Sequence, residues 1–457
     1  MNAAQPAVVR HRFAYGARGL GFISLGVVLA LLAAAIGVAL SKHPLSWTLV
    51  FAFGVGLLGV FALALARYDA AVALGVLLLA VVWVEPAPPD LVFAVVIAVA
   101  VATGRFRAAR IPFGVTSLIV AFLALNLLAA IEVLDVTRAM LFFSITLYLA
   151  VFAIWFAGYV NSVSRARLVV YAYLAAAVVS AAVASLALYV PFPGHNLFVM
   201  GPRAKGLFKD PNVFGAFLVP AALILLEEVA TPRLLRLRGI TKTVLLSVLG
   251  VGILFSFSRA AWLNVAVGAL VMFLVLALRR GGSRRATVIL AVVVTAAAAL
   301  FVSVAVTSSL SFLEQRARFQ VYDVQRFGAQ LSGVELAVQY PLGIGPGQFE
   351  RVLPISAHST YVRALAEEGL LGLLVLLALM VLTLVLATRN AGRGIDTYGI
   401  GSAVLLSAWC GLLANSVFID TLHWRHLWLV AALIWAGAAR RPPSRRAFEQ
   451  RPRYGWR

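Results

Sequence analysis

The chain consists of long apolar runs separated by short polar breaks, and this pattern continues from Leu20 to Ala439. Runs of roughly twenty apolar residues have the length of helices that cross a bilayer core. The strict alternation of a membrane β-barrel is absent, so the pattern predicts an all-α, polytopic transmembrane helical bundle. The predicted helices cover residues 20–40, 47–66, 70–84, 91–103, 113–131, 139–160, 168–190, 213–230, 243–258, 260–278, 287–309, 362–388, 398–416 and 427–439.

Two of the predicted helices, residues 70–84 and 91–103, are short for a membrane crossing and are alternatively a re-entrant or tilted pair. We therefore expect 12–14 helices. Composition agrees with a membrane protein, because 63% of the residues are hydrophobic and only 12% are charged. The single cysteine, Cys410, excludes a disulfide framework and a cysteine-ligated metal site. The basic N-terminal segment precedes a full-length apolar run without a clear cleavage site, which predicts a retained first helix.

Basic residues are distributed unevenly over the two faces of the predicted bundle. With the N-terminus inside, 26 of the 38 Lys and Arg residues lie in internal loops and tails, whereas 12 of the 17 acidic residues lie outside. This bias predicts that both termini are cytoplasmic, and it accounts for the net charge of +21 without nucleic-acid binding. Residues 1–19 are then a cytoplasmic N-terminus, residues 20–439 a single transmembrane domain, and residues 440–457 a basic cytoplasmic tail facing lipid headgroups.

Two predicted external loops, residues 191–212 and 310–361, are long enough to build a site. Apolar residues of the second loop recur at helical spacing, which predicts an amphipathic helix at the membrane interface. These residues are Phe327, Leu331, Val334 and Val338. A glycine-rich turn at residues 343–347 and the start of the next span follow, which places His358 near the outer mouth of the bundle.

Arg259 interrupts an apolar stretch at residues 243–278. As one helix this stretch would extend about 54 Å, nearly twice a bilayer core. A hairpin that turns at Ser256 to Arg259 is the economical alternative, and it brings Arg259 to the outer surface. There the guanidinium is suited to holding a phosphate bidentately, although an arginine that reaches for lipid headgroups is an equal alternative.

A second basic cluster lies in the first external loop, where a Gly/Pro-rich turn carries Arg203, Lys205 and Lys209. Asp210 is placed to cap the next helix and Pro211 fits its first turn. A capped helix start explains Asp210 well but explains Arg203 less well. For His358, a hydrogen-bonded interfacial histidine without catalytic work is the simpler alternative. The external acidic residues show no metal-ligand spacing, so no metal and no cofactor are expected.

Together these blocks resemble the O-antigen ligase and polymerase superfamily of bacterial membrane glycosyltransferases. The resemblance covers mainly residues 200–440, and one departure is Ser359, where many relatives carry Asn after the histidine. The blocks that carry it are RAKGLFKDPNVFGAFL (residues 203–218), FSFSRAAWL (255–263), RFGAQLSGVELAVQYPLGIGPGQF (326–349) and AHSTYVRALAEEGLLGLL (357–374).

The resemblance implies an inverting, metal-independent transfer of a glycan from undecaprenyl diphosphate to an acceptor hydroxyl, such as that of lipid A-core in lipopolysaccharide biosynthesis. It implies that the protein lies in the inner membrane with its active site facing the periplasm, among membrane lipids. It assigns the general base to His358 and diphosphate binding to Arg203 and Arg259. The supporting residues that it suggests are Tyr361, Arg326, Lys205 and Asp420.

Other functions remain open at this point. A polymerase of the same superfamily would use a second lipid-linked glycan as acceptor, and a protein O-glycosyltransferase would use a protein. A transporter of lipid-linked glycans would need charges within the spans that line a central cavity. The predicted spans carry few ionisable groups and the candidate residues gather at one face, which favours an enzyme.

Overall fold

The computed structural model describes residues 47–107, 111–279, 282–306 and 321–439. Within these residues the fold is helical with four two-residue strands. The helices are α2 (Trp47–Ala66), α3 (Tyr68–Leu77), α4 (Pro88–Ala102), α5 (Phe113–Ala129), α6 (Val136–Tyr159), α7 (Val163–Leu186), α8 (Pro211–Ala230), α9 (Gly239–Phe255), α10 (Arg259–Ala277), α11 (Ser283–Val306), α13 (Val321–Gln339), α14 (Phe349–Val352), α15 (Thr360–Arg393), α16 (Ser402–Phe418) and α17 (Arg425–Ala438).

The predicted helix at residues 20–40, the terminal segments 1–19 and 440–457, and residues 310–320 of the large loop lie outside the described residues. Elsewhere each predicted span corresponds to a helix. Five of these are long and apolar enough to cross a membrane: α6, α7, α8, α10 and α15. Seven shorter apolar helices of 10–17 residues accompany them.

Polar residues start several helices as expected. The Asp210 carboxylate accepts the Asn212 N–H, and Pro211 occupies the first turn of α8. Ser258 caps α10 by accepting the Ala261 N–H, so the apolar stretch at residues 243–278 is a hairpin of α9 and α10 that turns just before Arg259. The hairpin prediction is therefore confirmed.

The prediction of one helix over residues 70–84 is wrong beyond Ala80. Helix α3 ends at Leu77, and a 3₁₀ turn, η1 (Leu78–Ala80), leads into the strand β1 (Val81–Val82). This strand pairs in parallel with β4 (Leu207–Phe208), so the β-branched valines extend rather than coil. The remaining strands, β2 (Val199–Met200) and β3 (Arg203–Ala204), form an antiparallel pair in the loop before α8.

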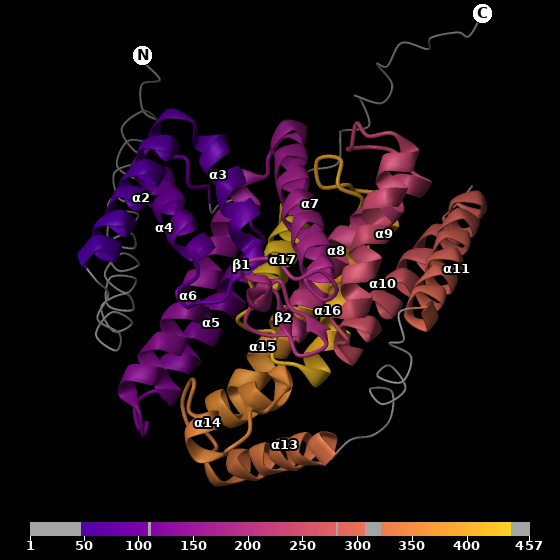
Figure 1. Cartoon of the computed structure of the whole chain (residues 1–457). Coiled ribbons are helices and arrows are strands. Elements are labelled where there is room, and N and C mark those ends of the chain that lie inside the picture. Colours follow the sequence, from indigo (N-terminus) through magenta and orange to yellow (C-terminus); the bar gives the residue numbers. More distant parts are fainter. Residues whose placement is uncertain (1–46, 108–110, 280–281, 307–320, 440–457) are drawn as a thin grey trace, which may run out of the picture.

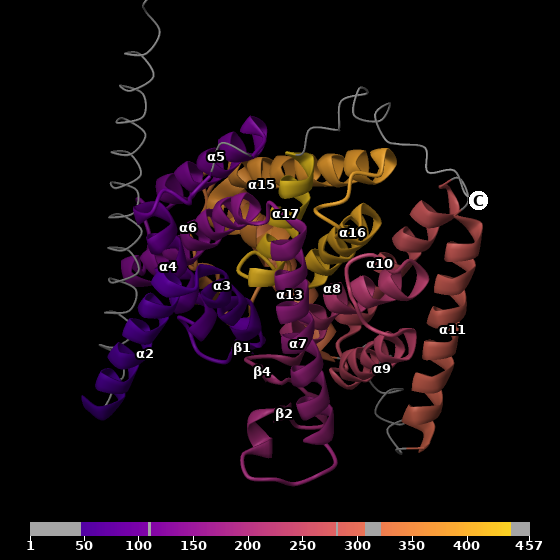
Figure 2. The same ribbon diagram turned by 90° about the horizontal axis from the view of Figure 1, so that it is seen from above.

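The helices form one bundle with α2 and α11 at opposite edges (Figures 1 and 2). Helix α17 is buried over most of its length and lies among the other spans. Helix α13 crosses the lower end of the bundle in Figure 1, next to α14 and the start of α15. Residues far apart in the sequence therefore meet at this end.

The charged residues that join neighbouring helices lie at or beside the ends of the predicted spans. Buried ion pairs join helices inside the bundle, because a buried charge is stable only beside an opposite one. The Lys242 ammonium lies 2.8 Å from the Glu228 carboxylate, and the Arg425 guanidinium donates to Asp90 at 2.7 Å. Each pair fixes one helix against another: α9 against α8, and α17 against α4.

Candidate functional site

Arg203 joins two of the motif blocks that are distant in the sequence. Its Nε donates to the Ser256 carbonyl oxygen at 2.9 Å, and its Nη2 donates to the Asn212 side-chain oxygen at 3.0 Å. Gly215 makes this approach possible, because a Cβ there would lie 2.5 Å from the Ser256 hydroxyl. The start of α8 thus packs directly on the turn that precedes Arg259.

Arg259 begins α10 and points toward α13. Its guanidinium makes a bidentate pair with the Asp323 carboxylate, with one contact at 3.0 Å and a second, shorter one. Asp323 is buried, whereas a third of the Arg259 side chain is exposed. The guanidinium is therefore held in the orientation in which it can also bind a second anion, since carboxylate and phosphate offer it the same two-oxygen geometry.

His358 has a backbone conformation that only a few per cent of non-glycine residues adopt. Its φ is 46°, in the left-handed region. The Phe257 residue in the Arg259 turn has a similar φ of 45°. Such strain costs about 1–3 kcal/mol and is concentrated at functional sites, so its occurrence in two of the motif blocks is notable.

The imidazole of His358 is surrounded by charged groups of both signs. Burial lowers its pKa to about 4, and Arg326 and Arg363 add to this lowering. Asp210 and Glu350 oppose it by stabilising the imidazolium. At neutral pH the ring is therefore uncharged and able to accept a proton, as a general base must.

Helix α13 connects these groups. The Arg326 guanidinium donates to the Phe418 carbonyl oxygen at the end of α16, and the Gln330 amide approaches the His358 carbonyl oxygen at 3.5 Å. Asp323, on the same helix, holds Arg259. Helix α13 thus contacts two of the motif blocks, at the Arg259 turn and the His358 segment, and also the end of α16.

The other predicted residues have definite places. The Tyr361 hydroxyl donates to the Leu413 carbonyl oxygen at 3.1 Å, so its hydrogen bond is to α16 and not to His358. Lys205 lies in the turn between β3 and β4, where its main-chain N–H bonds to the Phe198 carbonyl oxygen. Asp420 lies in the loop before α17 and forms an ion pair with Arg363 at 2.8 Å. Their roles in the reaction stay predictions.

Sequence reasoning missed Arg363, as it missed Asp323, the partner of Arg259. Arg363 is 4% exposed and forms ion pairs with Glu350, Glu367 and Asp420. Arg363 and Glu367 are four residues apart on one face of α15, which is a spacing that favours an ion pair. That spacing, next to an apolar span, is the sequence signal that could have revealed it. The network ties the glycine turn and the α16–α17 loop to the helix that follows His358.

The glycine turn packs closely against α15. Gly343 and Gly369 have φ values of 90° and 71°, and a Cβ on Gly343 would lie 2.2 Å from the Glu367 carbonyl oxygen. Glu367 in turn accepts the main-chain N–H groups of Gly347 and Phe349 at 2.8 and 2.9 Å. The glycines are required here by both conformation and space, as the turn prediction assumed.

Acidic side chains of this site are engaged by arginines rather than gathered to hold a metal. Within the described part of the chain, no group of three or more His, Cys, Asp or Glu side chains has the geometry of a metal site. Glu350 illustrates the pattern: burial alone would raise its pKa, but the charge and hydrogen bond of Arg363, together with hydrogen bonds from Ser356 and the backbone, keep the pKa below its ordinary value. The arrangement is an uncharged imidazole within the electrostatic influence of two arginines, Arg326 and Arg363.

Comparison with known proteins supports the resemblance. Residues 244–377 match the family model described as O-Antigen ligase. No curated protein matches the chain. The matched segment runs from α9 into α15 and therefore contains both Arg259 and His358, whereas Arg203 lies before it. This match agrees with the motif blocks, so residues 244–377 of this multi-pass membrane protein are similar to the O-antigen ligase family.

Proposed function

We propose that this protein is an O-antigen ligase-like glycosyltransferase of the bacterial inner membrane. It moves a glycan en bloc from undecaprenyl diphosphate to a hydroxyl of lipid A-core, with its active site facing the periplasm and both termini in the cytoplasm. The observation that carries the proposal is that Arg203 bonds to the turn before Arg259, while α13 contacts both Arg259 and the His358 segment.

The proposed step is an inverting displacement at the anomeric carbon. The His358 imidazole takes the proton of the acceptor hydroxyl while that oxygen forms a bond to the anomeric carbon. The bond from this carbon to the diphosphate oxygen breaks, and undecaprenyl diphosphate leaves with the electron pair. The low pKa of His358 keeps the imidazole uncharged and ready to accept the proton before the substrates bind.

Arg203 and Arg259 are the groups proposed to bind the diphosphate and to stabilise its charge as it leaves. Two guanidinium groups can supply the positive charge that a metal ion supplies in other phosphate sites. Arg259 would then donate to phosphate oxygens, either together with the Asp323 carboxylate or in its place, since both anions bind the same guanidinium nitrogens. The reaction is therefore proposed to need no metal.

A polymerase of the same superfamily is the second candidate, because the family match fits both activities. Its acceptor would be another lipid-linked glycan. A transporter of such glycans is a weaker alternative, since the buried charges of Lys242, Arg425 and Arg363 are each neutralised by an acidic partner.

Reconstitution tests the proposal and separates its variants. The purified chain in nanodiscs is given a lipid-diphosphate glycan donor together with lipid A-core and a second donor as competing acceptors. A ligase glycosylates lipid A-core, and a polymerase lengthens the lipid-linked glycan. Activity that persists in EDTA supports the arginine mechanism. Activity that EDTA abolishes and magnesium or manganese restores contradicts it, and the absence of any transfer contradicts the function.

A further inference from the structure

His358 lies in a segment that has no helix or strand of its own. The segment joins α14 to α15, and His358 has the strained φ of 46° within it. A conformation of this kind persists only where the surrounding contacts enforce it. Ala357, on one side, is buried with Phe349 and Ala366, and Ser359, on the other side, caps α15. Contacts from neighbouring elements therefore hold the backbone on both sides of the histidine.

Arg363 reaches back across His358 from the first turns of α15. Its Nη2 donates to the Ser356 hydroxyl oxygen at 3.0 Å, two residues before the histidine. Its main-chain N–H donates to the Ser359 carbonyl oxygen at 3.0 Å, one residue after the histidine. A single residue thus bonds to the chain on both sides of His358, and the first of these bonds fixes the segment to α15.

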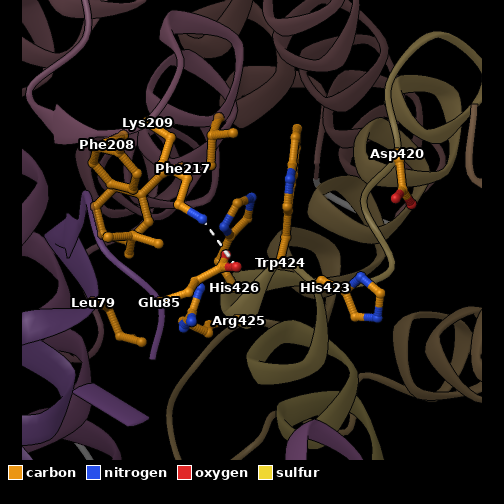
Figure 3. Close-up of a pocket in the computed structure, with 12 residues that line it drawn as sticks. Leu79, Glu85, Phe208, Lys209, Phe217, Asp420, His423, Trp424, Arg425 and His426 are labelled. Carbon is orange, nitrogen blue, oxygen red and sulfur yellow. Dashed lines mark ion pairs between the residues drawn. The ribbon is translucent and has the colours of Figure 1, made fainter. Parts of the chain in front are cut away.

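Three carboxylates from different segments fix the Arg363 guanidinium. Its Nη1 lies 3.1 Å from Glu367 of α15 and its Nε lies 2.8 Å from Asp420, while Glu350 of α14 makes a shorter contact. Figure 3 shows Asp420 on the loop that leads into α17, where it lines a cavity of about 160 Å³. A lysine has one ammonium on a flexible stem and does not reproduce this planar set of donors. The direction of the guanidinium toward Ser356 is therefore set by its acidic partners.

We propose that Arg363 is a positioning residue for His358. It holds Ser356, and through it the His358 segment, in the conformation that directs the imidazole to the acceptor hydroxyl. A displacement of about 1 Å at a reacting group can lower a rate about 100-fold, so such a hold matters for transfer. That the positioned histidine takes a proton rests on the proposed function, whereas the hold on the segment does not.

Hydrogen exchange measured by mass spectrometry tests the hold without any substrate. The full chain in nanodiscs is compared with Arg363→Lys and with Ser356→Ala, which removes only the hydroxyl that Arg363 contacts. In both variants the amides of residues 353–359 should exchange about ten-fold faster. Ser247→Ala, which removes a hydroxyl bonded to Thr243 on α9, is the control and should exchange like the wild type. Equal exchange of this segment in the wild type and both variants overturns the proposal.

The transfer assay separates positioning from a purely electrostatic effect. The charged groups that act on His358 are Arg326, Arg363, Asp210 and Glu350, and a lysine at position 363 leaves their total charge unchanged. Arg363→Lys should therefore lower kcat about 100-fold, with KM for the donor and the acid limb of the pH profile unchanged. A purely electrostatic role predicts a normal kcat in Arg363→Lys and an acid limb that moves to higher pH in Arg363→Gln. That result overturns the proposal.

Controls separate folding effects from positioning. Arg233→Lys, at an ion pair with Asp396 in the loop between α8 and α9, should transfer like the wild type. All rates are expressed per folded molecule, so a loss that follows only the folded fraction shows a structural role and contradicts positioning. If the wild type transfers glycan to neither acceptor, the proposed function fails, and hydrogen exchange still decides whether Arg363 holds the His358 segment.

Discussion

At the scale of single residues, His358 combines a strained backbone with an imidazole that stays uncharged. The φ of His358 is in the left-handed region, and burial, aided by Arg326 and Arg363, lowers the pKa of its imidazole and keeps the ring unprotonated. The uncharged ring can accept a proton, although a pKa of about 4 makes it a weaker base than an ordinary histidine. The same description also fits a structural histidine, so substitution has to decide between the two.

His358→Ala should lower kcat by about 10²–10⁴-fold, the usual loss for a general base. Donor binding should be nearly unchanged, since the diphosphate is assigned to the arginines. Both quantities are measured on folded protein in nanodiscs, with His195→Ala as the matched control. Turnover close to that of the wild type in His358→Ala would show that the histidine is structural.

The pH dependence should follow the low pKa of His358. The base must be uncharged, so kcat/KM should hold from neutral pH down to about pH 4 and fall as the pH drops through that value. Arg326→Gln removes a charge that lowers this pKa and should move the acid limb to higher pH. A bound diphosphate stabilises the imidazolium and raises the pKa of His358 in the substrate complex. The acid fall of kcat should therefore occur at a higher pH than the acid fall of kcat/KM. An acid limb that Arg326→Gln leaves in place would contradict the assignment.

Arg259→Lys keeps the charge but loses the two-pronged donor. The contact to Asp323 uses both terminal nitrogens, which indicates that the site is built for bidentate binding. Loss of one charge-assisted hydrogen bond predicts a fall in kcat/KM of about 10- to 100-fold. Arg165→Lys, which replaces an arginine paired with Asp69 at 3.2 Å, is the control and should behave like the wild type. Equal activity of the two variants would show that charge alone suffices at position 259.

At the scale of elements, α13 shows what a sequence pattern can and cannot reveal. The apolar spacing predicted this helix, and Phe327, Leu331 and Val338 are 49%, 63% and 78% exposed, as an interfacial face requires. Its buried residues include Asp323 and Gly333, whose partners lie 64 and 29 residues away along the chain. No local period encodes such pairings, so the role of α13 as a connector was not predictable.

Gly333 tests that role. A Cβ there would lie 2.7 Å from Val362 Cγ1 and 2.9 Å from Phe349 Cε2, so Gly333→Val must push α13 away from α15. Overpacking of this kind costs about 1–3 kcal/mol. Since α13 carries Asp323 and Arg326, activity should fall by more than about ten-fold, while thermal unfolding of the bundle changes little.

Gly328→Val is the matched control for this substitution in the same helix. A Cβ at Gly328 meets nothing within 4 Å, so the variant should keep the activity of the wild type. The ratio of the two activities therefore isolates the packing of α13 from the helix propensity of valine. Equal losses in both variants would show that α13 does not position the site.

At the scale of the whole molecule, hydropathy was enough to find the spans but not where each helix ends or which residues pair between helices. The α9–α10 hairpin followed from length alone, whereas the end of α3 did not, because Val81 and Val82 pair with residues more than 120 positions away. Arg363 was missed for a similar reason: of its partners, Glu367 is local, but Glu350 and Asp420 belong to other segments. The bias in Lys and Arg residues predicts which face of the bundle is cytoplasmic, and labelling of the protein in a membrane tests that prediction.

Helix α15 provides that test, because its spanning part is long enough to separate the two faces. From Gly369 to Arg393 the helix rises about 36 Å, more than the roughly 30 Å of a bilayer core. With Cys410→Ser as background, Ser332→Cys on α13 should react with an impermeant maleimide in intact spheroplasts. Gly392→Cys, near the other end of α15, should react only after permeabilisation, since the basic residues there are assigned to the cytoplasm. The reverse pattern would place His358 on the cytoplasmic face, where the proposed transfer to lipid A-core could not occur.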